Sequence, residues 1–192
     1  MGDRRTELLD GCIGYFLTHG VADLSLRPLG AAVGSSARLL IYHFGSKEGL
    51  ITAVMEEIQA RAQASFSTAG GTPPSDPGPM ATFWAWLTHP DNLPTTRLLF
   101  EIQVLALRNP EAYGAYLSEN SSNWMALILE MMPPSREARS MATLSAAVMD
   151  GLLLEYLSTG DLARTTAALA LFSRLMQGRP STSTVSQKKA RG

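Results

Sequence analysis

The stretch LSLRPLGAAVGSSARLLIYHFGSKEGL, residues 24–50, decides the fold of this chain. Two short segments with helical apolar spacing lie on either side of Gly34. Ser25 and Ser36 precede these segments, and serine is favoured at helix N-caps. Gly34 and Gly45 follow them, and glycine is favoured just past helix ends. The spacing predicts two short helices joined by a tight turn, which is a helix-turn-helix.

The second of these helices has the pattern of a DNA-reading helix. Leu40 and Phe44 have the spacing to pack inward against Leu29 and Val33 of the first helix. The opposite face would then lie in the major groove of DNA. We therefore predict that the DNA contacts come from the outward face of the second helix and from the helix starts on either side of it: Ser25, Arg27, Ser36, Ala37, Arg38, Leu39, Tyr42, His43 and Lys47.

Different roles are expected for these side chains. The fork of Arg38 suits guanine O6 and N7, and Leu39 suits a thymine methyl group. Tyr42 and His43 can donate to phosphates, and Lys47 in the first turn of the next helix can bind another phosphate. The alternatives are that Tyr42 and His43 cap the core and that Arg38 and Leu39 are solvent-exposed without a partner.

The rest of the chain divides around this segment. Residues 1–48 form the predicted DNA-binding domain, with a connecting fourth helix at 46–66. Glycines and prolines crowd residues 67–79, which predicts a loop. Residues 80–177 form a second helical block, and residues 178–192 have the composition of a disordered tail.

Composition restricts the class of protein. Apolar residues make up 45% of the chain and charged residues 17%, which is typical of a globular protein. No apolar run reaches the ~20 residues of a membrane span, and no signal peptide is recognisable, so we expect a cytoplasmic protein without membrane contact. The net charge is −1, and residues 1–64 hold six basic and seven acidic side chains. DNA binding must therefore depend on the placement of a few side chains.

The sequence resembles the TetR family of bacterial regulators. The resemblance covers roughly residues 5–60 and is carried by LSLRPLGAAVG at 24–34 and YHFGSKEGL at 42–50. It implies an all-α fold with an N-terminal three-helix DNA-binding domain and a C-terminal ligand-binding and dimerisation domain. It also implies a homodimer, an operator in double-stranded DNA that is expected to be palindromic, and a repressor that a small effector releases from that operator. Ala37-Arg38-Leu39 departs from the commoner start of the recognition helix, so the operator sequence is not predicted.

An effector pocket is expected among the aromatic and apolar residues of the second block, because such pockets are mostly apolar with a few polar anchors. The effector would be small and apolar or amphipathic, and no cofactor is expected. Glu101, Asp150 and Glu155 could face this pocket, form ion pairs or lie exposed, and the pattern leaves these alternatives open. The predicted pocket residues are Phe83, Trp84, Phe100, Gln103, Leu107, Tyr116, Trp124 and Met149.

The last two predicted helices, 141–157 and 162–176, have the composition of a dimer interface. Small residues, Ser145, Ala146, Ala147 and Gly151, would let helices approach closely. Apolar area would come from Leu144, Val148, Leu152, Leu169, Phe172 and Leu175. The alternative is ordinary packing within one chain.

Other functions fit the sequence less well. The runner-up is a helical-bundle enzyme or ligand-binding protein without DNA binding, and a third reading is a helix-turn-helix used for protein contact. His19, His43 and His89 are scattered, so no metal site is predicted. Cys12 lies on the apolar stripe of the first helix and is predicted to be core, and no phosphate loop or nucleophile elbow is present. We therefore expect no enzyme activity.

Overall fold

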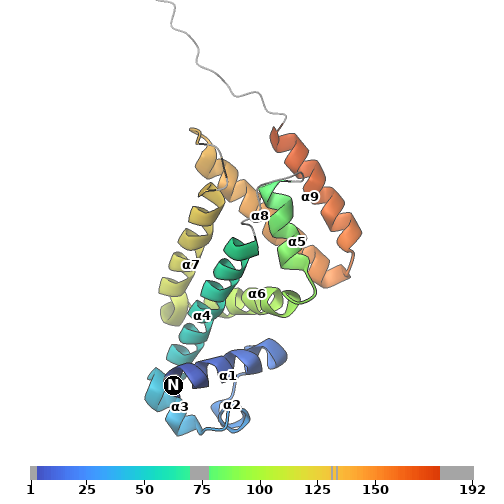
Figure 1. Cartoon of the computed structure of the whole chain (residues 1–192). Coiled ribbons are helices and arrows are strands. Elements are labelled where there is room, and N and C mark those ends of the chain that lie inside the picture. Colours follow the sequence, from blue (N-terminus) through green and yellow to red (C-terminus); the bar gives the residue numbers. More distant parts are fainter. Residues whose placement is uncertain (1–3, 70–77, 131, 133, 178–192) are drawn as a thin grey trace, which may run out of the picture.

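A computed structural model describes residues 4–69, 78–130, 132 and 134–177. All regular secondary structure in these residues is helical, which confirms the predicted all-α fold (Figure 1). The helices are α1 (Arg4–His19), α2 (Leu26–Ala32), α3 (Ala37–Phe44), α4 (Lys47–Ala69), α5 (Pro79–Thr88), α6 (Leu93–Arg108), α7 (Pro110–Glu130), α8 (Ala138–Thr159) and α9 (Leu162–Gln177).

Helices α1, α2 and α3 form the lower part of the molecule in Figure 1, and α4 rises from them beside α7. Leu29, Leu40 and Leu50 are completely buried, and Phe44 is buried beside them. Of the inward-facing set predicted from the sequence, Leu29, Leu40 and Phe44 are buried and pack α2 and α3 together, whereas Val33 is only partly buried against the same core. Cys12 is buried in the same core, as predicted.

Several predicted bounds differ from the structure: the helix predicted at 141–157 is α8, Ala138–Thr159, and the loop predicted at 67–79 is shorter at both ends. The predicted loop began at residue 67, but α4 continues to Ala69 because Ser67-Thr68-Ala69 contains neither glycine nor proline. Helix α5 begins at Pro79, because proline at a first helical position gives up no intrahelical hydrogen bond. The remainder of the predicted loop, residues 70–77, and the predicted tail, residues 178–192, lie outside the described residues.

The core of the DNA-binding part continues into the second block. Leu98, Ile102 and Ala106 of α6 and Tyr113 and Tyr116 of α7 are buried in the same cluster as the apolar residues of α1 to α4. In Figure 1, α6 lies between α1 and the upper helices. Burial of α6 against α1 and α4 therefore joins the two parts of the chain through one continuous core.

A second core cluster fills the upper part of the molecule. It consists of Phe83, Trp84 and Leu87 of α5, Met149 and Leu153 of α8, and Leu169 of α9. Helix α5 is thus held against the α8–α9 pair, and the space between α5, α7 and α8 is bounded by large apolar side chains.

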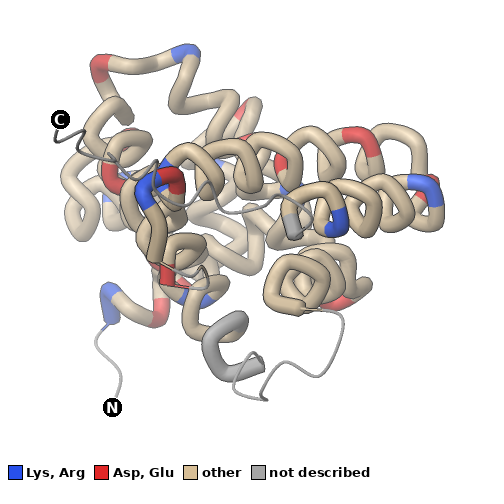
Figure 2. Tube along the Cα trace, turned by 90° about the horizontal axis from the view of Figure 1, so that it is seen from above, with Lys and Arg blue, Asp and Glu red and all other residues tan. Residues whose placement is uncertain are grey.

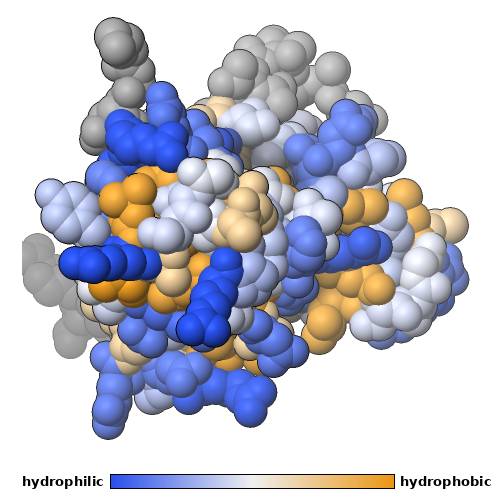
Figure 3. Space-filling model, turned by 90° about the horizontal axis from the view of Figure 1, so that it is seen from below, coloured by the Kyte–Doolittle hydropathy of each residue, from blue (hydrophilic) through white to orange (hydrophobic). Residues whose placement is uncertain are grey.

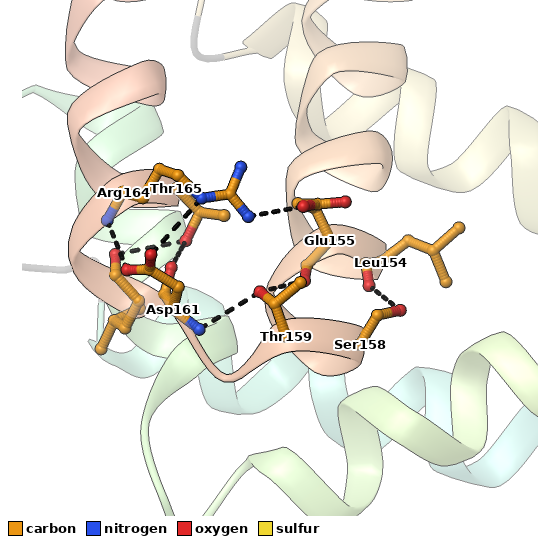
Figure 4. A network of polar contacts seen from close by, with 8 residues as sticks. Leu154, Glu155, Ser158, Thr159, Asp161, Arg164 and Thr165 are labelled. Atoms are coloured by element: carbon orange, nitrogen blue, oxygen red, sulfur yellow. Dashed lines mark hydrogen bonds and ion pairs between the residues drawn. The ribbon is translucent and has the colours of Figure 1, made fainter.

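The turn between α8 and α9 is fixed by polar contacts (Figure 4). The Arg164 guanidinium pairs with Glu155 of α8 and with Asp161, and these carboxylates raise the pKa of Arg164. Gly160 takes the left-handed conformation that ends α8, with φ of 74°. Glu155, whose role the sequence left open, is therefore part of an ion pair within the chain.

Charged residues are sparse along the trace and do not gather into one block, as the view from above shows (Figure 2). Among the described residues, no helix combines the length and hydropathy that crossing a membrane requires.

Candidate nucleic-acid interface

The turn between α2 and α3 is tightly closed. Gly34 has a positive φ of 62°, and the Ser35 amide donates to the Gly30 carbonyl at 2.8 Å. A Cβ atom on Gly30 would lie 2.9 Å from the Ala37 nitrogen. The backbone of α2 at Gly30 is therefore in direct contact with the backbone at the start of α3. This close approach fixes the orientation of α3 relative to α2.

Serine precedes the helices α2, α3 and α4, but only two of these three serines make a capping hydrogen bond. Ser36 is extended and its Oγ accepts a hydrogen bond from the Leu39 amide at 3.2 Å, which is the geometry of an N-cap. Ser25 takes the N-cap backbone conformation before α2, but its exposed side chain makes no capping hydrogen bond. At the start of α4, Ser46 Oγ accepts from the Gly49 amide at 2.9 Å.

The outward face of α3 carries the predicted DNA contacts. Tyr42 is 80% exposed, and Arg38 is exposed on the preceding turn. His43 is half-buried and its ring meets that of Tyr42 edge to face, with 5.3 Å between centroids. Ala37 and Leu39 are also half-buried. The structure therefore presents Tyr42 and Arg38 most fully, with the other side chains of α3 beside them.

The flanking predicted contacts lie on the neighbouring helices. Arg27 is exposed in the first turn of α2, and Lys47 is the half-buried first residue of α4. Seen from below, where α1 to α3 lie in Figure 1, the surface is largely hydrophilic with smaller hydrophobic patches (Figure 3). This end of the molecule suits a polar, charged partner.

Two further arginines lie at this end of the molecule, and the sequence analysis did not predict them as DNA contacts. Arg4 donates to the Gly34 carbonyl at 3.4 Å and pairs with Glu7 at 3.1 Å. The guanidinium of Arg5 lies 5.1 Å from the centre of the Phe44 ring. Both side chains are exposed and add positive charge next to α3. The adjacent arginines at the start of α1 were the signal that could have revealed them.

Two adjoining cavities occupy the second block. The first, here called the aromatic cavity, has a volume of about 210 Å³ and lies among α5, α6, α7 and α8. The second, the methionine cavity, has a volume of about 450 Å³ and is lined by five methionines, among them Met149. Five of the predicted pocket residues line the aromatic cavity: Phe83, Phe100, Gln103, Tyr116 and Trp124.

Trp84 and Leu107 line neither of these two cavities. Trp84 is buried in the upper core and its indole N–H donates to Thr166 Oγ1 at 2.8 Å, so it faces α9. Leu107 lies on the outer side of α6 and is 63% exposed. The aromatic cavity instead includes Asp150 and Asn120, and the sequence had left the position of Asp150 open.

Glu101 connects the second block to the DNA-binding domain. Its carboxylate accepts a hydrogen bond from the Val21 amide at 3.0 Å, in the turn between α1 and α2. The fit is close, because a Cβ atom on Gly20 would lie 2.5 Å from Glu101 Oε2. Glu101 therefore faces the α1–α2 turn and does not line either cavity.

The residues predicted for a dimer interface divide into two groups. Leu144 and Leu175 are 46% and 64% exposed, so they remain available for contact with a second copy of the chain. Leu169 is buried in the upper core and Ser145 is buried at the methionine cavity. These two therefore belong to packing within the chain, because α9 turns Leu169 toward α5 and α8.

We compared the chain with protein families, with curated sequences and with solved structures. Residues 8–54 match the family model described as bacterial regulatory proteins, tetR family. The comparison with curated protein sequences gave no match. The matched segment runs from α1 into α4 and includes the whole helix-turn-helix.

Solved structures resemble the chain over most of its length. The multidrug binding protein EbrR in complex with imidazole is 26% identical, with a TM-score of 0.68 covering 95% of this chain and 99% of that chain. The same protein with ethidium is 24% identical, with a TM-score of 0.71 covering 90% and 98%. A putative TetR-family regulator from Rhodococcus sp. is 18% identical, with a TM-score of 0.70 covering 91% and 98%. Residues 8–54 thus match the DNA-binding domain of the tetR family over the whole helix-turn-helix, and the nine described helices share the fold of solved regulators of that family, which supports a DNA-binding transcription regulator.

Proposed function

We propose that this regulator is a repressor that binds a palindromic operator as a homodimer and leaves it when a small amphipathic effector enters the aromatic cavity. The observation that carries the proposal is the lining of that cavity, where aromatic walls surround hydrogen-bond acceptors. DNA contacts come from α3 and its flanks, with Arg38 at bases and Tyr42, His43 and Lys47 at phosphates.

The cavity lining favours a particular effector chemistry. The Phe83 and Trp124 rings lie 5.5 Å apart and Phe100 adds a third aromatic wall. Asp150 is the one ionisable carboxylate of the lining, and desolvation by its surroundings raises the pKa of this group. Asn120 Oδ1 and Tyr116 Oη are buried without a hydrogen-bond partner among the described residues. An aromatic effector that carries a protonated amine satisfies these groups, because it donates hydrogen bonds and neutralises Asp150.

The related structures support a cavity of this type. EbrR is described as a multidrug binding protein, and its structures contain imidazole and ethidium. Ethidium is a flat aromatic cation, so a fold of this kind can accommodate the chemistry proposed here.

Helix α6 provides a path from the cavity to the DNA-binding domain. Phe100 and Gln103 line the cavity, and Glu101 between them holds the Val21 amide in the α1–α2 turn. An effector that moves these two side chains therefore moves the helix that holds the turn. The coupling needs differential affinity of the effector for two positions of α6.

The homodimer would form through α8 and α9. Leu144, Leu154, Leu162, Leu171 and Leu175 are each more than a third exposed on these two helices. Burial of such an apolar surface against the same surface of a second copy is favourable. Two-fold symmetry would then place two α3 helices on two half-sites of the operator.

A matched pair of ligands tests the effector chemistry. Release of a fluorescently labelled operator duplex is followed by anisotropy with 2-phenylethylammonium and with its neutral counterpart 2-phenylethanol. We expect release by the cation at concentrations where the alcohol has no effect. Asp150→Asn should abolish the difference between the two ligands, whereas Glu130→Gln, an exposed carboxylate at the end of α7, should preserve it. Equal effects of both ligands on the unmodified protein would contradict the proposed effector class.

A further inference from the structure

A third cavity, of about 400 Å³, lies between α4 and α7 and is separate in character from the two above. Helices α4 and α7 run side by side in Figure 1. Its polar lining comes from both: Glu56, Gln59 and Gln63 of α4, and Tyr116, Glu119 and Asn123 of α7. We call it the polar cavity.

The polar cavity replaces the apolar contact that two packed helices normally make. Gln59 and Gln63 are one helical turn apart on α4, and Glu119 and Asn123 are one turn apart on α7. Packed helices usually bury apolar stripes against each other. Lower on α4 the stripe is apolar, with Val54 and Ile58 buried. At this cavity, carboxylates and carboxamides therefore take the place of the apolar side chains found lower on α4.

Buried polar atoms point to a ligand at this position. Gln59 and Tyr116 are each only 6% exposed. Gln59 Nε2, Gln63 Nε2 and Tyr116 Oη have no hydrogen-bond partner among the described residues. Buried polar groups in folded proteins are nearly always hydrogen-bonded, so three such atoms around one cavity require an explanation. A ligand with hydrogen-bonding groups of its own supplies the partners.

The charged residues of the cavity determine which sign of ligand charge it favours. Glu56 and Glu119 form no ion pair among the described residues, and no lysine, arginine or histidine belongs to the lining. Burial, with a contribution from the Glu56 charge, raises the pKa of Tyr116 to about 12, so the phenol stays protonated. The cavity therefore favours a cation.

We infer that the polar cavity binds a small hydroxylated amine, of the amino-sugar class, in its protonated form. The ammonium group pairs with Glu56 and Glu119, and the ligand hydroxyls accept from the two carboxamide nitrogens and exchange hydrogen bonds with Tyr116. A simple polyamine offers no acceptor to Gln59 Nε2 and Gln63 Nε2. A metal ion fits less well, because the described residues contain no group of three or more His, Cys, Asp or Glu able to hold one.

The polar cavity and the proposed effector cavity share Tyr116, which lines both, and otherwise use different side chains. The position has a structural consequence, because α4 also packs against the helix-turn-helix through Leu50 and Ile51. A ligand held by both α4 and α7 would brace the DNA-binding domain against the second block.

Calorimetric titration of the full chain with D-glucosamine, N-acetylglucosamine and spermidine tests the inference. We expect D-glucosamine to bind, N-acetylglucosamine to give no heat because acetylation removes its charge, and spermidine to bind at least tenfold more weakly than D-glucosamine. The paired variant Glu56→Gln/Glu119→Gln should weaken D-glucosamine binding at least tenfold, and Glu130→Gln should leave it unchanged. Absence of D-glucosamine binding, or equal binding to the paired variant, would overturn the inference.

Gln59→Leu provides a second readout that does not depend on charge. Removing a buried, unpaired carboxamide should raise the thermal midpoint of the unliganded protein. The same change should remove the stabilisation by D-glucosamine. A lower midpoint with unchanged ligand stabilisation would show that Gln59 serves packing alone. Asp150→Asn should leave D-glucosamine binding intact, so failure at the aromatic cavity and failure at the polar cavity are distinguishable.

Discussion

Gly30→Ala tests the close approach of α2 and α3 on which the presentation of α3 depends. The new methyl group would lie 2.9 Å from both the Ala37 nitrogen and the Ser36 carbonyl carbon, which are backbone atoms that cannot move aside singly. Relief requires α3 to shift as a unit. We therefore expect loss of stability together with weaker DNA binding.

The magnitude follows from comparison with Gly14→Ala. Gly14 is an exposed residue within α1, and a Cβ atom there would meet nothing within 4 Å. Both substitutions gain about 0.5–1 kcal/mol of helix propensity. Only Gly30→Ala adds overpacking, which costs about 1–3 kcal/mol. The two variants should thus differ by about 1–3 kcal/mol, or about 2–4 °C in thermal midpoint for each kcal/mol in a chain of this size.

Urea unfolding followed by far-ultraviolet circular dichroism measures this difference, with all proteins at one concentration because the proposed dimerisation would contribute to apparent stability. Gly14→Ala should be at least as stable as the unmodified protein, and Gly30→Ala should be less stable. Equal stability of the two variants would refute the close packing of the turn. Normal operator affinity in a destabilised Gly30→Ala would refute its control of α3.

Three further predictions concern single side chains. Arg38→Ala should cost about 1–3 kcal/mol at one base position of each half-site and relax specificity there, which a panel of operator mutants would show. Glu101→Ala should remove a charge-assisted hydrogen bond of about 1.5–3 kcal/mol and speed hydrogen exchange of the Val21 amide, and unchanged protection of that amide would contradict this. Asp150→Asn should raise the thermal midpoint at pH 7, because its raised pKa makes the ionised form unfavourable in the folded chain. That gain should vanish as pH falls below the unfolded aspartate pKa of about 3.9, where both states are protonated, and a pH-independent gain would exclude the carboxylate as its cause.

The sequence was sufficient for the helix-turn-helix because its signals are local. Ser36 caps α3 and Gly34 makes the turn through contacts within a few residues, and Leu40 occupies the core position that its spacing predicts. These features depend on backbone conformation and helical periodicity, both of which can be read from neighbouring residues.

The second block was predictable only in part, because apolar residues occupy several faces of a helix such as α5. Phe83 and Trp84 are adjacent, yet Phe83 faces the aromatic cavity and Trp84 faces α9. No period distinguishes the two when several faces of α5 are apolar. The contact of Glu101 with Val21 spans 80 residues, and no local pattern indicates a partner at that distance. Ser145 shows the same limit, because small residues suit packing within a chain as well as between chains.

Selection of bound duplexes from a random DNA pool tests the central claim most directly, which is that α3 reads a specific site. The enriched sequence should contain two inverted half-sites about one helical turn apart or a multiple of it, and affinity for it should fall steeply with salt. Arg38→Ala should enrich a site that has lost its preference at one position in each half. A pool that remains random, or an enriched site that is identical for the unmodified protein and for Arg38→Ala, would contradict the account.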